Sequence, residues 1–245
     1  MKKETDVSRR EFLKTASLTL ASPIFLKTER LLNPEYTTVI NKINTERPLY
    51  AITIDDGWDS NVLERMLEML TENKTKATFF LVGKAATGLG QRLVRKIACK
   101  GHEIAYHSDK HEEGGVIQSK SFGDWSQDYN NWKYRMKDIL GETLYNCSVN
   151  PYARAPYGIF TKNFLKMCGK NNLTPYAWTH GTDGFQNKIK KGDILLLHVR
   201  ENDLDALDFS LGNITNNLSA TSIGGILNPQ KKRSISYLKT KAKAR

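Results

Sequence analysis

The 245-residue chain has few of the residues that build covalent or modular scaffolds. Its three cysteines, Cys99, Cys147 and Cys168, include no Cys-x-x-Cys pair. At most one disulfide is open to the chain, so the sequence predicts neither a disulfide framework nor a cysteine-based zinc module. It also lacks zinc-finger spacing, an RNA-binding aromatic run and a Gly-rich phosphate loop. No nucleic-acid partner is therefore predicted.

Long apolar runs are absent as well. No stretch reaches the roughly 18 apolar residues that a membrane-spanning helix needs, so no span is predicted beyond a possible N-terminal signal anchor. The formal net charge is +11, and residues 231–245 carry seven Lys or Arg and no acid. This basic tail is predicted to be a disordered, solvated terminus, with contact to an anionic polymer as the alternative.

The N-terminus has the layout of an export signal. The run Ser8-Arg9-Arg10-Glu11-Phe12-Leu13-Lys14 precedes an uncharged stretch from Thr15 to Leu26. A charged region followed by a short apolar region is typical of a secretory signal, and the paired arginines resemble the twin-arginine type. We predict that residues 1–30 are an export signal or N-terminal anchor, read by the twin-arginine export machinery. The protein would then reside in the periplasm, cell envelope or extracellular space; a basic amphipathic first helix is the alternative.

Residues 45–230 alternate short apolar runs with helical patterns, which predicts one α/β domain with a parallel sheet. Strands are predicted at 49–54, 77–82, 103–106, 152–154, 174–178 and 194–198. Helices are predicted at 62–70, 89–100, 122–140, 160–171 and 203–207. The run 223–227 fits either a last strand or a loop.

Charged and imidazole side chains follow several of these predicted strands directly. They are Asp55, Asp56, His107, Arg154 and His198. In α/β folds the chemistry collects at the carboxyl ends of the strands, so these residues are predicted to meet in one site.

A metal site is predicted from Asp56, His107 and His111. Two imidazoles and a carboxylate are a common ligand set for catalytic zinc, with positions left open to water and substrate. Such a metal acidifies water and polarises a carbonyl. Because adjacent strand residues point to opposite faces, a turn after the strand must bring Asp55 and Asp56 to the same pocket.

The remaining residues suit hydrolysis of an amide or ester. Asp55 would be free to act as general base, and Arg154 beside it would keep it ionised. His198 could protonate a leaving amine. Backbone N–H groups near Pro156-Tyr157-Gly158 could receive an oxyanion.

Four segments resemble, in order, the motifs of NodB-type polysaccharide deacetylases, carbohydrate esterase family 4. They are Thr53-Ile54-Asp55-Asp56-Gly57, His107-Ser108-Asp109-Lys110-His111, Arg154-Ala155-Pro156-Tyr157-Gly158 and Leu195-Leu196-Leu197-His198. The resemblance extends over about residues 48–199. It implies a distorted (β/α) barrel with fewer than eight regular strands.

The resemblance also implies an activity. A metal-dependent hydrolase of this kind removes acetyl groups from an N-acetylated polysaccharide: peptidoglycan, chitin-like or poly-N-acetylglucosamine. It would act on carbon–nitrogen but not peptide bonds, with one divalent ion, Zn²⁺ or alternatively Co²⁺ or another.

The resemblance assigns a role to each site residue. Asp55 would be the base, His198 the acid and Arg154 the support of Asp55. Asp56, His107 and His111 would be the metal ligands. Tyr157 would offer its backbone N–H to the oxyanion, and Leu196 would line the pocket for the acetyl methyl.

One motif departs from the family pattern. Where the family usually has two Asp and a Trp, this chain has Gly181, Gly184 and Phe185, with Asp183 as a possible substitute through a shifted loop. The family acid at this place tunes the catalytic histidine, so His198 is predicted to lack its usual carboxylate support. A catalytically weak, glycan-binding member of the family is therefore the alternative function.

Overall fold

The computed structural model describes residues 37–182, 188–212 and 217–228, all of which belong to one unit spanning Glu35–Arg245. The export signal or anchor assigned to residues 1–30 and the basic tail at 231–245 lie outside the described residues. Asp183, Gly184 and Phe185 do so too. Those assignments remain predictions.

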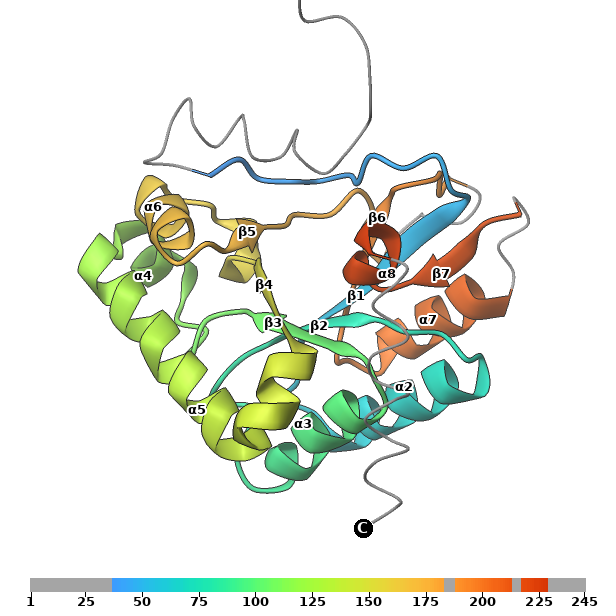
Figure 1. Cartoon of the computed structure of the whole chain (residues 1–245), viewed down its shortest axis with the longest axis horizontal. Helices are drawn as coiled ribbons and strands as arrows, with labels where there is room; N and C mark the ends of the chain where they lie inside the picture. The colour runs from blue at the N-terminus through green and yellow to red at the C-terminus, as the bar shows by residue number, and fades with distance from the viewer. Residues whose placement is uncertain (1–36, 183–187, 213–216, 229–245) are drawn as a thin grey trace, which may run out of the picture. The chain divides into compact units, whose positions relative to one another are not determined.

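A curled parallel sheet forms the centre of the fold (Figure 1). Its strands are β1 (Leu49–Asp56), β2 (Thr78–Leu81), β3 (Glu103–Tyr106), β4 (Val149–Ala153), β5 (Thr174–Pro175), β6 (Ile194–His198) and β7 (Ser219–Thr221). The spatial order is β5-β4-β3-β2-β1-β6, with β7 paired to the start of β1. The predicted α/β fold, a distorted barrel with fewer than eight strands, is confirmed.

Helices flank the sheet, most of them on its outer side. They are α2 (Ser60–Glu72), α3 (Leu89–Cys99), α4 (Gly114–Ser119), α5 (Phe122–Ser148), α6 (Lys162–Lys170), α7 (Asn202–Gly212) and α8 (Ile223–Leu227), with a 3₁₀ turn at Pro156–Gly158. In Figure 1, α5, α3, α2 and α7 follow one another around the outside, whereas α8 lies on the inner side. The predicted helix at 122–140 continues to Ser148 through a kink at Gly141, where φ is 67°.

Successive side chains along the strands pack into two different apolar cores, one on each face of the sheet. Ile52 and Ile54 of β1 pack against the helices, whereas Ala51 packs into a second cluster on the inner side. Because successive strand residues point to opposite faces, Asp55 shares the inner face with Ala51. In β6, His198 likewise shares the inner face with Ile194. The register then places Asp55 beside His198, at the carboxyl ends of neighbouring strands.

The run 223–227 is a helix, neither of the two forms that its sequence suggested. The Ser222 side chain caps α8. The first backbone N–H groups of α8 donate hydrogen bonds to residues at the starts of β2 and β3. Ile223 N–H donates to Thr78 Oγ1 at 3.0 Å, and Gly224 N–H donates to Glu103 Oε2 at 3.1 Å. The helix therefore closes the amino end of the inner face, opposite the predicted site. A further difference is β5, which has two residues where a strand over 174–178 was predicted, and α4 and β7 were not predicted.

The three cysteines form no disulfide with one another. Cys99 is exposed, Cys147 is half-buried and Cys168 is buried. The Cys168 side chain is part of the apolar core, and this burial raises the pKa of its thiol well above its ordinary value.

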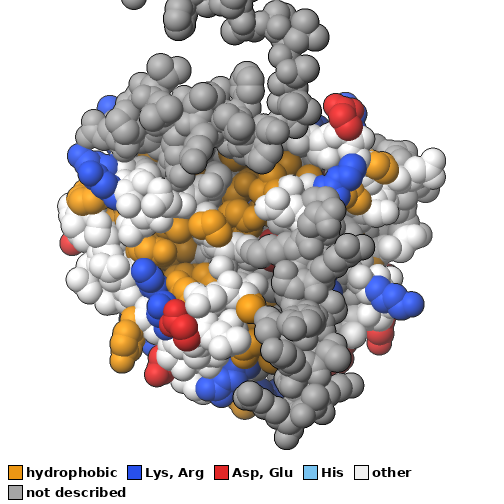
Figure 2. All heavy atoms as spheres, viewed as in Figure 1, with side chains coloured by type: hydrophobic (Ala, Val, Ile, Leu, Met, Phe, Trp, Pro, Cys, Tyr) orange, Lys and Arg blue, Asp and Glu red, His pale blue; other side chains and the backbone are white. Residues whose placement is uncertain are grey.

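The face seen in Figure 1 is apolar in its middle. Figure 2 shows a band of apolar side chains there, with Lys and Arg side chains separated around the rim. Within the described part of the chain, no helix is both long and apolar enough to cross a membrane.

Candidate active site and metal site

Arg154 is buried at the end of β4 and joins three strands. Its side chain is 0% exposed, and Nη1 donates to Asp55 Oδ1 at 2.7 Å and to Thr53 Oγ1 at 2.9 Å. Nε and Nη2 donate to the carbonyls of Tyr176 and Ala177 at 3.1 and 2.9 Å. Burial lowers the pKa of the guanidinium, and the carboxylate of Asp55 opposes that shift. A buried ion pair with its donors satisfied holds Asp55 in one orientation.

Asp56 leaves the alternation of β1 because its backbone is left-handed. Its φ is 78°, and that of Gly57 is 106°. Few residues other than glycine adopt this conformation. In a continuing strand the Asp56 side chain would point to the face opposite Asp55, and the left-handed backbone prevents this. Asp56 Oδ1 lies 3.5 Å from Nε2 of His107 and 3.5 Å from Nε2 of His111. The turn required by the sequence is present.

The two histidines are oriented by the backbone around them. His107 follows β3, and its Nδ1 donates to the carbonyl of Arg154 at 3.0 Å, so Nε2 faces the two aspartates. The distance from His107 Nε2 to Asp55 Oδ2 is 3.6 Å. His111 has a φ of 51°, and its ring meets the Tyr157 ring edge-on with 4.8 Å between centroids.

The charges around these rings set their protonation. Burial disfavours the charged form of His107, but Asp55 and Asp56 beside it raise its pKa overall. Burial and the neighbouring His107 lower the pKa of His111. Burial likewise opposes ionisation of Asp56, yet its contacts with His107 lower its pKa overall. The lowered pKa values of Asp56 and His111 favour the forms that bind a cation, whereas the raised pKa of His107 means that a cation would compete with a proton at that ring.

Asp56, His107 and His111 fit a divalent metal. One ligand atom from each lies within 4.8 Å of the others, and no other such group occurs within the described ranges. Asp56 Oδ1 is buried and has no hydrogen-bond partner, which is costly unless a cation or proton satisfies it. The bond from His107 Nδ1 to a carbonyl is the usual outer contact of a metal-binding histidine.

Asp128 of α5 holds the loop between the two histidines. It is 4% exposed, and its Oδ1 accepts the hydroxyl of Tyr106 at 2.5 Å and the N–H of Asp109 at 2.7 Å. Its Oδ2 accepts from Lys120 Nζ at 2.9 Å and from the Ser108 hydroxyl at 3.3 Å. Ser108 Oγ in turn accepts the N–H of His111 at 2.9 Å. A chain of hydrogen bonds therefore runs from α5 to a candidate metal ligand.

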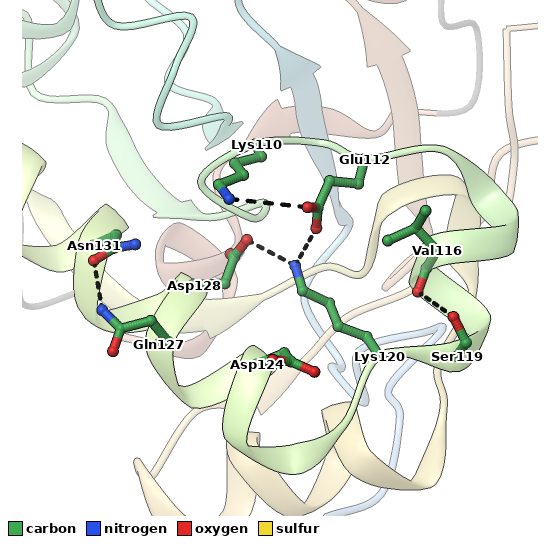
Figure 3. A pocket seen from close by; sticks show the side chains of 9 residues that line it. All are labelled: Lys110, Glu112, Val116, Ser119, Lys120, Asp124, Gln127, Asp128 and Asn131. Atoms are coloured by element: carbon green, nitrogen blue, oxygen red, sulfur yellow. Dashed lines mark hydrogen bonds and ion pairs between the residues drawn. The ribbon is translucent and has the colours of Figure 1, made fainter.

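Figure 3 shows Lys120 between the carboxylates of Glu112 and Asp128. The side chains drawn there line a cavity of about 250 Å³ between α4 and α5, next to the segment that follows His111. The polar groups on its wall bond to one another, with Lys120 Nζ 2.6 Å from Glu112 Oε2. The cavity adjoins the site but is separate from the cluster of Asp56 and the two histidines.

His198 has a carboxylate partner, contrary to the prediction. Asp203, at the start of α7, is 5% exposed, and its Oδ2 lies 3.6 Å from His198 Nδ1. The same oxygen accepts the backbone N–H of His198, and Oδ1 accepts the Thr182 hydroxyl at 3.3 Å. Burial opposes ionisation of Asp203, but its bonds to His198 lower its pKa overall. The expectation was wrong because it considered only an acid in the loop before His198, whereas Asp203 comes from the helix after it.

The two residues predicted to contact substrate lie at this edge of the sheet. Tyr157 is 57% exposed and has a φ of 57°. Leu196 is 5% exposed, pairs with Thr53 across the sheet, and belongs to neither core cluster of the described residues. Leu196 lies two residues before His198 on the inner face, so it borders the same space.

Comparison with known proteins identifies the family. Residues 42–176, more than half of the chain, match the family model described as polysaccharide deacetylase. The chain belongs to the polysaccharide deacetylase family. This is a family of hydrolases that deacetylate carbohydrates.

Two curated relatives of this deacetylase-family chain are longer than it is. An uncharacterized protein of Bacillus subtilis, YlxY, is 26% identical over 75% of this chain and 61% of its own length. A peptidoglycan-N-acetylglucosamine deacetylase of Bacillus cereus is 29% identical over 64% of this chain and 60% of its own length. The alignments thus span less than two thirds of both relatives.

A solved structure supports the fold of this family member. The wild-type Bacillus anthracis protein described as a carbohydrate esterase family 4 pseudoenzyme aligns with a TM-score of 0.67 and 21% identity. The alignment covers 78% of this chain and 69% of that one. At this identity the likeness concerns the curled sheet and its helices.

Some residues around the site were not singled out from the sequence. They are Thr53, Lys120, Asp128, Tyr176 and Asp203. Asp203 carried a weak signal, because an acid in the first turn of a predicted helix five residues after His198 can reach back to that strand end. The sequence around Asp128 gave no signal of its role, since a single acidic residue in a long helix is ordinarily exposed to solvent.

Replacing Asp128 with Asn should lower the free energy of unfolding by about 2–4 kcal/mol. The buried donors that bond to Asp128 would lose a negatively charged acceptor, and Lys120 would keep only the carboxylate of Glu112. The measurement is the free energy of unfolding in urea. The matched control is Asp138→Asn, an exposed aspartate on the same helix, which should change it by less than about 0.5 kcal/mol. Equal effects of the two substitutions would contradict a supporting role for Asp128.

Proposed function

We propose that this protein is a metal-dependent hydrolase that removes acetyl groups from an N-acetylated polysaccharide. The observation that carries the proposal is the pairing of two aspartates with different environments. Asp55 is bound by the buried Arg154 at 2.7 Å, and Asp56 presents an unsatisfied buried oxygen to two imidazoles. One acid is thereby available as a base, and the other as a ligand.

Asp56, His107 and His111 would hold one divalent ion, Zn²⁺ or alternatively Co²⁺ or another. When bound, such an ion supplies Lewis acidity to the acetyl carbonyl and lowers the pKa of water. The family comparison and the donor set support this assignment.

The other residues would divide the proton transfers. Arg154 contacts Oδ1 of Asp55, so Oδ2 is left to take a proton from the attacking water as a bond forms to the acetyl carbon. The backbone N–H of Tyr157 would stabilise the oxyanion. His198 would give a proton to the glycan nitrogen as the carbon–nitrogen bond breaks, which yields acetate and an amine. Leu196 would contact the methyl group.

The glycan is proposed from the relatives. One is named a peptidoglycan-N-acetylglucosamine deacetylase, and another, from Sinorhizobium fredii, a chitooligosaccharide deacetylase. Both names support an N-acetylated glycan, so peptidoglycan, chitin-like and poly-N-acetylglucosamine polymers are the substrates to test.

The second candidate function is glycan binding with weak or no turnover. It is supported by the altered loop at Gly181 and by a structural neighbour described as a pseudoenzyme. Two features of the site favour turnover instead. The proposed base Asp55 is present and paired with Arg154, and His198 has the Asp203 carboxylate beside it.

Acetate release from N-acetylglucosamine oligomers and peptidoglycan, measured with added zinc or cobalt, separates these functions. Asp55→Asn should lower kcat by on the order of 10³-fold, because the group that takes the proton is lost. The Asp138→Asn variant should match the wild type. No release from either substrate would favour the binding function, and full turnover by Asp55→Asn would remove Asp55 as the base.

His111→Ala should lower the metal content of the purified protein, because one of three ligands is lost. Elemental analysis after dialysis measures the zinc per chain. His180→Ala is the matched control, since His180 Nε2 pairs with Asp193 at 2.9 Å and belongs to no ligand group. A full zinc load in His111→Ala would argue against the three-ligand site.

Export through the twin-arginine machinery is also proposed, from Arg9 and Arg10. Replacing both with Lys should retain the protein in the cytoplasm, because this type of signal depends on the arginine pair. Fractionation of cells followed by immunoblotting measures the distribution. Changing Lys2 and Lys3 to Arg is the control that keeps the basic charge; unchanged export of the Arg9/Arg10 variant would refute the proposal.

A further inference from the structure

The carboxylate that faces His198 comes from an unexpected direction. After β6 ends at His198, the chain turns within three residues and enters α7, whose second residue is Asp203. The first turn of a helix favours a negative charge, so an ionised Asp203 is stabilised there. Asp203 is 5% exposed, whereas Asp205 and Asp208 on the same helix are exposed.

Asp203 makes three contacts that join separate parts of the site. Its Oδ2 accepts the backbone N–H of His198 and lies 3.6 Å from Nδ1 of the same residue. Its Oδ1 accepts the hydroxyl of Thr182 at 3.3 Å. Thr182 follows Gly181, the position at which the family motif has an acid, so Asp203 also contacts that loop.

The contact to the ring has a chemical consequence. A neutral imidazole carries its proton on one of two nitrogens, and a carboxylate beside Nδ1 favours the form in which Nδ1 is the donor. Nε2 is then the ring nitrogen left for a substrate. A distance of 3.6 Å is longer than a hydrogen bond, but such contacts often shorten when a substrate is bound.

We propose that Asp203 is the positioning residue of His198, taking the part that in the family motif belongs to an acid where this chain has Gly181. Its carboxylate holds the ring so that Nδ1 faces Asp203 and Nε2 faces the leaving nitrogen of the glycan. This inference rests on the proposed deacetylase function for its effect on turnover, but the orientation of the ring does not depend on it.

The first test measures directly which ring nitrogen of His198 carries the proton. Zinc-loaded protein labelled with ¹⁵N-histidine gives signals from five histidines, and His198 is assigned by its loss in His198→Gln. At a pH where the ring is neutral, the wild type should carry its proton on Nδ1, and Asp203→Asn should shift it toward Nε2. A wild-type ring protonated on Nε2 overturns the proposal, whatever the activity and even if the variant does not fold.

The second test reads turnover. Asp203→Asn keeps an oxygen that can accept the backbone N–H of His198 but removes the charge. It should lower kcat for acetate release by roughly 10–100-fold, the range for residues that orient a reacting group, with KM and zinc content unchanged within about twofold. Asp203→Glu should recover part of that loss, because the charge returns.

Asp205→Asn is the matched control, since it removes an exposed aspartate from the same turn and should leave kcat unchanged. A folded Asp203→Asn variant with wild-type kcat would refute the proposal. If the wild type releases no acetate from any polymer, the deacetylase function fails, and the ¹⁵N spectrum alone decides whether Asp203 positions His198.

Discussion

The buried pair of Arg154 and Asp55 is the interaction on which the rest of the site depends. It is fully enclosed, it ties the end of β1 to β4, and the other guanidinium donors reach the carbonyls of Tyr176 and Ala177 beyond β5. The carbonyl of Arg154 also orients His107. Removing one partner of such a pair leaves an unpaired buried charge, typically at about 3–5 kcal/mol. The same side chain therefore stabilises the curled sheet and sets the geometry of both aspartates.

Backbone strain is concentrated where the candidate ligands lie. Asp56, Ser108, His111 and Tyr157 all have left-handed backbones, which non-glycine residues rarely adopt and which cost about 1–3 kcal/mol each. Hydrogen bonds around Asp128 offset that cost by holding the loop between the histidines. The strain has a clear effect at Asp56, because the left-handed turn brings its carboxylate toward the two imidazoles. Strand geometry alone would have sent Asp55 and Asp56 to opposite faces.

The altered loop and the acid on α7 bear together on whether this family member turns over substrate. The loop at Gly181 departs from the family pattern. The site nevertheless combines Asp55 paired with Arg154, the unsatisfied Oδ1 of Asp56 and a histidine with a carboxylate beside it. Asp55 and Asp56 end β1, His198 ends β6 and His107 follows β3, and they meet because these strands are parallel and in register at their carboxyl ends.

Local pattern by itself determined the α/β architecture, since apolar alternation and helical spacing depend on neighbouring residues. The motif spacing likewise predicted Asp55, Asp56, His107, His111, Arg154 and His198 as one site, because parallel strands end at the same edge. Tertiary structure decided the rest. The run 223–227 became a helix because Thr78 and Glu103 bond its N–H groups. Asp203 became the partner of His198 because α7 packs back against β6, a contact for which an acid in the first turn of the predicted helix is only a weak local signal.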